Sequence, residues 1–236
     1  MISKDCMNRI LSLRNHFPKL DEKGGILLPL DLKIRDIDFM KYRHLPVNWD
    51  TEAVRNDDLP DEFSPDSVKL VDMFRRKTID LNYEAMLIFD YKTAELVYCF
   101  VSDNESGEVN GDVDENVLKS KSIAIIHNHP RDFYSPPSAR NFQILALDFE
   151  DYELVSSWDS LWILESKENI PNTFVDEIRR EIQILYENVT ENAYAIYDEN
   201  EEGFVKASDA YGNLLLNYIN NIKLNINLTR RDFDDN

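Results

Sequence analysis

The stretch His127-Asn128-His129-Pro130 directly follows an apolar run at residues 123–126, and this junction constrains the fold more than any other feature of the chain. The run Ile-Ala-Ile-Ile predicts a buried β-strand that ends at His127. Side chains two positions apart in a strand point to the same side of a sheet. We therefore expect His127 and His129 to converge on one point, as two imidazoles that share a metal ion would. The chain has four histidines, and the other two have no partner pattern.

Two later positions and one earlier position extend this motif. Seven residues separate Pro130 from Ser138, Asn141 follows three positions after the serine, and Glu84 lies in an apolar stretch some forty residues before His127. The pattern H-x-H-P, seven residues, S-x-x-D, with an upstream glutamate, resembles the JAB/MPN (JAMM) metalloprotease family. That family includes deubiquitinating enzymes, prokaryotic isopeptidases and RadC-like proteins. The resemblance covers residues 78–168 and matches four of five positions; the fifth has Asn141 where the family has aspartate.

The resemblance implies a zinc centre. In the family two histidines and the aspartate hold Zn²⁺, and a water fills the fourth position. By resemblance, His127 and His129 are zinc ligands, and Asn141 stands at the third ligand position. Glu84 is then the general base and acid, and Ser138 stabilises the oxyanion. The implied activity is hydrolysis of an amide bond by a metal-activated water. The substrate would be an extended peptide or the tail of a ubiquitin-like protein.

Asn141 weakens this expectation because an amide oxygen is neutral. We expect its presence to lower zinc affinity, although a less negative site would also acidify a bound water more strongly. Two nearby acids are candidates to replace the missing carboxylate. Asp148 lies about 10 Å further along a helix expected to begin after Ser138, which is too far. Asp132 lies in the intervening loop and is the better placed of the two.

Each candidate residue also has a structural alternative. Ser138 suits a helix N-cap whatever its chemistry, and Glu84 suits an outward-facing strand position. Phe133 and Tyr134, in the loop between the two halves of the motif, either line a substrate groove or pack the loop down.

Composition sets the class of protein. The chain has 236 residues, 43% of them hydrophobic, which is enough for one or two domains with a sizeable core. It carries 45 acidic and 26 basic residues, for a net charge of −19, which argues against non-specific binding to nucleic acid or anionic membranes. An acidic surface suits a basic partner, but solubility alone also explains it.

Without a secretory segment or a transmembrane run, a cytoplasmic location is expected. Cys6 and Cys99 lack metal or redox spacing, and Cys99 is expected in the core.

The fold class predicted is α/β (α+β), with a mixed β-sheet core flanked by helices. Three parts are expected: an N-terminal extension at 1–77 with a helix in 1–15 and short strands in 21–66, a JAB/MPN-like domain at 78–168, and a C-terminal helical extension at 169–236. Expected strands are 84–90, 95–101, 123–126, 152–156 and 161–164. Expected helices begin at Ser67, capped by Asp66 or Ser67, and at 139, 172 and about 211; the helix from 139 runs to 149 with Ser138 as its cap. Residues 103–114 and 198–203 are expected as acidic loops, and 229–236 as a frayed tail.

The sequence leaves three functions open. The first is a zinc-dependent peptidase or isopeptidase. The second is a catalytically inactive JAB-fold module used for binding or scaffolding. The third is a RadC-like protein of DNA-related function, against which the acidic charge and the lack of a basic stripe count. The two C-terminal helices are expected either to pack on the core as a hairpin or to bind a partner.

Overall fold

The computed structural model describes residues 53–79, 81, 83–102, 113–130, 133–147, 149–166, 170–222, 224 and 226–233. The expected N-terminal helix and strands, Cys6, most of the first acidic loop, Asp132 and Asp148 lie outside these residues. Within them, no helix combines the length and apolar character needed to cross a membrane.

A six-stranded mixed sheet forms the centre of the described fold, in the order β2-β1-β3-β4-β5-β6. Its strands are β1 (Ala85–Asp90), β2 (Leu96–Val101), β3 (Ile123–Asn128), β4 (Tyr152–Ser156), β5 (Ser160–Ser166) and β6 (Ile226–Asp232). β3 and β4 pair in parallel, and the other neighbouring pairs in this order are antiparallel. The predicted mixed sheet flanked by helices is confirmed.

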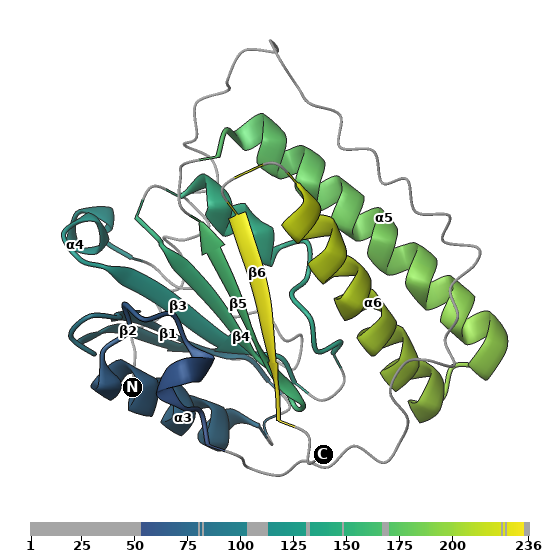
Figure 1. The fold of residues 1–236 in the computed structure, drawn as a ribbon, viewed down its shortest axis with the longest axis horizontal. Coiled ribbons are helices and arrows are strands. Elements are labelled where there is room, and N and C mark those ends of the chain that lie inside the picture. The colour runs from purple at the N-terminus through teal and green to yellow at the C-terminus, as the bar shows by residue number, and fades with distance from the viewer. Residues whose placement is uncertain are drawn as a thin grey trace.

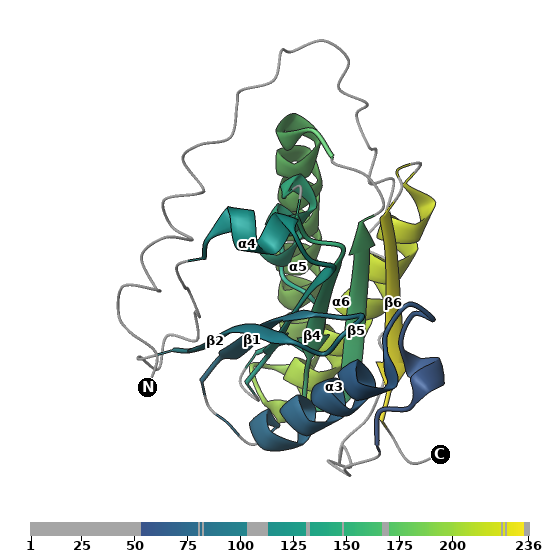
Figure 2. The same ribbon diagram turned by 90° about the vertical axis from the view of Figure 1, so that its left-hand side faces the viewer.

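Helices cover both faces of this sheet. They are η3 (Asn56–Asp58), α3 (Pro65–Thr78), α4 (Glu115–Lys119), η4 (Asn141–Ala146), α5 (Asn172–Tyr197) and α6 (Glu201–Asn221), where η marks a 3₁₀-helix. α3 lies on one side of the sheet, and the α5–α6 hairpin lies on the other (Figures 1 and 2). Strand alternation explains this division, because Leu154 packs with the α3 side while the next residue, Val155, packs with the hairpin.

The long helices form because each has one apolar stripe to bury. α5 buries residues at three- and four-residue spacing: Val175, Ile178, Ile182, Leu185 and Val189. Full burial of each such side chain contributes about 1.5–3 kcal/mol. α6 supplies the facing stripe, which includes Ala207, Ala210 and Leu215. The hairpin therefore packs on the core, which is one of the two expected alternatives.

Two helix starts differ from the prediction. α3 begins at Pro65 with Ser64 as its N-cap, rather than with Asp66 or Ser67. Proline is favoured at the first helical position because its missing N–H needs no partner there. α6 begins at Glu201, so the expected acidic loop is partly its first turn; the Asn200 side chain accepts a hydrogen bond from Gly203 N. Acidic side chains are stabilised by the positive end of the helix dipole.

The expected helix from Ala139 to Phe149 is wrong. Among the residues of this range that the structure describes, only the 3₁₀-helix η4 forms, and Leu147 after it is already extended. Ser138 is not its N-cap, because the serine hydroxyl hydrogen-bonds to the Asn141 side chain instead.

The expected frayed tail at 229–236 is wrong over residues 229–232, because they belong to strand β6, which pairs with β5; residues 234–236 lie outside the described part of the chain. Ile226 and Leu228 alternate into the core on the hairpin side. Charged residues end the strand, and Arg230 is nonetheless mostly buried because carboxylates surround it. A charged strand of this kind carries no hydrophobic pattern in its second half, so periodicity alone does not reveal it.

Candidate functional site

The predicted site residues come together on the face of the sheet that the α5–α6 hairpin and η4 cover. In β3 the side chain of His127 points to this face, and His129 follows two positions later. Met86 on β1 pairs with His127, so Glu84 comes level with His129 just before the start of β1. Asn141 reaches the same place from η4. The convergence expected from the motif is therefore present.

His127 is buried, and both of its ring nitrogens have partners. Its Nδ1 lies 2.8 Å from Oε1 of Glu153 on β4. Its Nε2 lies 3.0 Å from Nδ2 of Asn141. In the family that the motif resembles, a histidine nitrogen in this position would be free to face the metal. Here the asparagine side chain lies against it.

The orientation of the Asn141 amide follows from its other neighbours. Its Oδ1 accepts hydrogen bonds from the backbone N–H of Ser138 at 2.6 Å and from the Ser138 hydroxyl at 3.0 Å. A backbone N–H can only donate, so the amide atom that faces it must be the oxygen. The Nδ2 group is thereby directed to His127 and, at 3.4 Å, to Oε1 of Glu153. Asn141 therefore presents hydrogen-bond donors to the side of the site where a metal ligand is expected.

His129 is held as a neutral imidazole. Its Nδ1 lies 2.8 Å from the carbonyl oxygen of Tyr134, which can only accept, so Nδ1 carries the proton. Burial, followed by the neighbouring His127, lowers the pKa of His129 to about 3, against smaller opposing effects of hydrogen bonds to the backbone. The two imidazole centroids are 5.2 Å apart.

The charge on His127 is set by opposing effects. Burial lowers its pKa, but the carboxylate of Glu153 and then that of Glu84 outweigh burial, and the pKa is raised. The donor from Asn141 works against this shift, because Nε2 accepts that hydrogen bond only while it is unprotonated. The charge of Glu84 therefore acts on the same imidazole as the charge of Glu153.

A second buried carboxyl group lies beside Glu153. The pKa of Glu150 is raised well above its usual value, first by burial and then by the charges of Glu153 and Asp151. Among the described residues, neither carboxyl oxygen of Glu150 has a hydrogen-bond partner, and neither does Oε2 of Glu153. Like charges this close disfavour double ionisation. Burial beside Glu153 therefore favours the neutral form of the Glu150 carboxyl group.

The side chains at this position can be compared with the ligands that a zinc ion needs. A zinc centre of the implied type needs two imidazole nitrogens and a third ligand of the Cys, His, Asp or Glu kind. Over the part of the chain that is described, no three such side chains are grouped closely enough to hold a metal ion. The atom that Asn141 turns toward His127 is an amide nitrogen, which has no lone pair to give a metal. In this arrangement the residues do not fit the implied zinc centre.

Sequence reasoning missed two residues that build the site. Glu153 is an acid within an otherwise apolar strand, and that contrast was its only sequence signal. Asn128, between the two histidines, points to the opposite side of β3. Its Oδ1 accepts from Ala85 N at 2.7 Å, and its Nδ2 donates to the carbonyl of Tyr83 at 3.0 Å. This amide fixes the start of β1 and hence the position of Glu84.

The loop residues between the halves of the motif behave differently from each other. Tyr134 is buried among Tyr186, Phe204 and Tyr211, so it packs the loop against the helical hairpin. Phe133 is 40% exposed. Ser138 is also exposed, and its hydroxyl is engaged by Asn141.

No family model matches this chain, and searches of curated proteins and of solved structures give no match. The resemblance to the JAB/MPN family therefore continues to depend on the motif residues and on the site that they form.

Proposed function

We propose that this chain is a catalytically inactive JAB/MPN-like module for binding or scaffolding, because its metal position is closed by Asn141. The single observation that carries the proposal is the orientation of the Asn141 amide. Ser138 N–H holds its oxygen, so its nitrogen is directed at Nε2 of His127. The metal-binding nitrogen is thus already engaged as an acceptor.

The surrounding hydrogen bonds support this proposal. Glu153 accepts from Nδ1 of His127, and the same carboxylate oxygen lies within reach of the Asn141 amide. His127, Asn141 and Glu153 thus form a hydrogen-bonded set in which both nitrogens of the His127 ring have a partner. A buried imidazole whose two nitrogens are both hydrogen-bonded needs no ion to satisfy it.

A second candidate function is the zinc-dependent peptidase or isopeptidase that the motif implies. The grouping of Glu84, His127 and His129 on one face favours it. For zinc to bind, the Asn141 side chain would have to leave His127 and give up its two hydrogen bonds from Ser138. Each such bond contributes about 0.5–1.5 kcal/mol, so the amide opposes the ion directly.

Zinc binding by the wild-type chain and by Asn141→Asp separates these functions. A carboxylate at 141 accepts from Ser138 with one oxygen and offers the other to a metal. We expect near-stoichiometric zinc in Asn141→Asp and none above background in the wild type, measured by plasma mass spectrometry after gel filtration. His127→Ala in the Asn141→Asp background should abolish that zinc. Asn116→Asp, which adds the same charge on the exposed face of α4, is the matched control.

Cleavage is tested on a ubiquitin-like tail joined to lysine through an isopeptide bond. The proposal predicts no zinc-dependent hydrolysis by the wild type. Stoichiometric zinc in the wild type, together with hydrolysis that Glu84→Gln abolishes, would establish the peptidase instead.

A further inference from the structure

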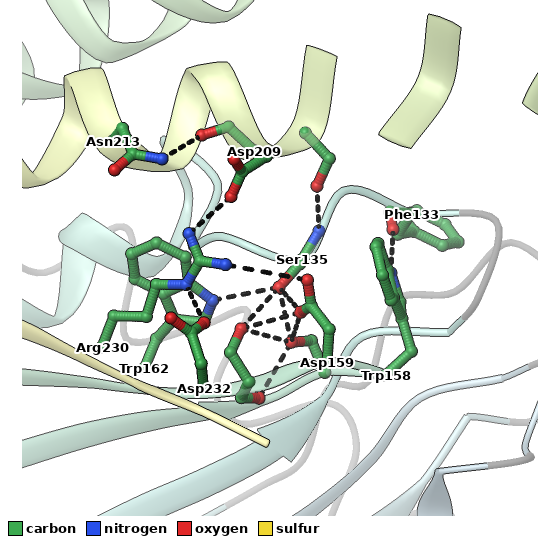
Figure 3. Close-up of polar contacts among 12 residues, drawn as sticks. Phe133, Ser135, Trp158, Asp159, Trp162, Asp209, Asn213, Arg230 and Asp232 are labelled. Atoms are coloured by element: carbon green, nitrogen blue, oxygen red, sulfur yellow. Dashed lines mark hydrogen bonds and ion pairs between the residues drawn. The ribbon is translucent and has the colours of Figure 1, made fainter. Parts of the chain in front are cut away.

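A buried polar network surrounds Ser135, which lies in the loop between the two halves of the motif (Figure 3). The Ser135 hydroxyl lies 2.6 Å from Oγ of Ser157 and 2.8 Å from Oγ of Ser160, and it donates to the carboxylate of Asp159. The indole N–H of Trp162 donates to the same hydroxyl at 3.1 Å. All five residues are 2% exposed or less.

Arg230 joins this network to the C-terminal strand and helix. Its guanidinium lies 3.9 Å from Asp159 Oδ2 and 2.8 Å from Asp209 Oδ1 on α6, and its Nε pairs with Asp232 at 2.5 Å (Figure 3). The Arg230 side chain is 8% exposed. Removal of one partner from such a buried pair leaves an uncompensated charge, so the pair holds the two segments together.

The loop Phe133–Pro137, which we call the site loop, has further ties to the hairpin. Ser135 N donates to the hydroxyl of Ser208 at 2.9 Å, and the Tyr211 hydroxyl donates to the carbonyl of Pro137 at 2.8 Å. Both partners lie on α6. The site loop therefore contacts β5 and α6 directly and is linked to β6 through Asp159 and Arg230. None of these elements belongs to the motif.

The site loop packs closely against α6. A Cβ atom placed on Gly212 of α6 would lie 2.9 Å from Cγ of Pro136 and 2.7 Å from the Trp162 indole. The backbone of α6 thus approaches the site loop as closely as a glycine permits. Any displacement of α6 would be transmitted to the loop.

We propose that Ser135 and Asp159 are positioning residues for the candidate site and that Arg230 fixes them to the C-terminal segment. The network holds the site loop so that the Tyr134 carbonyl accepts from Nδ1 of His129. His129 is then kept as the tautomer with a proton on Nδ1 and none on Nε2. The inference rests on the proposed function only in taking His129 as a site residue.

Ser135→Ala tests this inference, with Ser67→Ala as its matched control. Ser67 is 0% exposed, and its hydroxyl donates to the carbonyl of Tyr91 at 2.7 Å on the α3 side of the sheet. The two substitutions remove the same atom from equally buried networks. Long-range proton–nitrogen spectra report the His129 tautomer in each folded variant, and amide hydrogen exchange reports the stability of the loop at residue 135.

We expect Ser135→Ala to replace the single Nδ1–H tautomer of His129 by a mixture and to speed exchange of the residue 135 amide by about tenfold. Ser67→Ala should change neither. An unchanged His129 spectrum in Ser135→Ala would overturn the inference. If that variant does not fold, the His129 spectrum of Arg230→Lys tests the inference instead. Lysine keeps the positive charge but lacks the planar set of donors of the guanidinium group. Zinc binding by the wild type would overturn the proposed function and leave this readout intact.

Discussion

Replacement of His129 by asparagine should change how the stability of the protein depends on pH. The pKa of His129 is lowered from 6.5 to about 3 in the folded protein, first by burial and then by His127. Below pH 6.5 the unfolded chain therefore binds a proton that the folded protein does not. His129 thus contributes stability that is fully present above this pH and is lost as the pH falls toward 3.

The size of this effect follows from the gap between the two pKa values. One pKa unit corresponds to about 1.4 kcal/mol, so the loss approaches about 1.4 kcal/mol for each pH unit and about 5 kcal/mol over the whole range. In the variant, the asparagine side chain has no titrating ring, while its amide Nδ2 still offers a donor to the Tyr134 carbonyl. The variant should carry a constant penalty for lost packing but no pH-dependent one from this position.

Urea unfolding of both proteins between about pH 7 and about pH 5 measures this difference. Other titrating groups are shared and largely cancel between the wild type and His129→Asn. The wild type should be the more stable at neutral pH, and its advantage should shrink by roughly 1 kcal/mol per pH unit as the pH falls. An advantage that stays constant across this range would show that His129 titrates normally and would refute its burial as a neutral ring.

Three further substitutions test other parts of the structure. Gly212→Ala should destabilise by about 1–3 kcal/mol, because its new methyl group would meet Trp162; thermal unfolding measures this loss, and an unchanged melting temperature would contradict the close packing. Asn128→Asp removes the donor to the carbonyl of Tyr83 and buries a charge, so we expect a loss of at least about 2 kcal/mol in urea unfolding; a neutral effect would argue against this amide as the anchor of β1. Asn200→Ala removes the N-cap of α6 and should cost about 1 kcal/mol, a loss that Asn200→Asp should not show.

The strands around the motif could be predicted from sequence because their patterns are local. The apolar run before His127 and the stretches at 152–156 and 161–164 all form strands. Strand β6 could not be predicted this way, because Arg230 is buried by carboxylates that come from α6 and from the turn before β5. The burial of Arg230 depends on partners that are distant in the sequence, and the local hydrophobic pattern does not identify them.

The site was predictable as a set of residues but not as a chemical state. Spacing places His127, His129 and Asn141 together, and the structure agrees. Whether Asn141 offers oxygen or nitrogen to His127 depends on the Ser138 N–H, whose direction is set by the turn that precedes η4. Glu153 is a partner of His127 only because β4 runs parallel to β3 in a particular register. Neither fact can be read from a motif.

We infer that the Asn141 amide donates to Nε2 of His127 and so closes the metal position. Nitrogen spectra of the His127 ring at alkaline pH, recorded without and with added zinc, test this hydrogen bond most directly. We predict a neutral ring protonated at Nδ1, with Nε2 as a hydrogen-bond acceptor, and no change on addition of zinc. A zinc-dependent shift of Nε2 in the wild-type protein would contradict the claim.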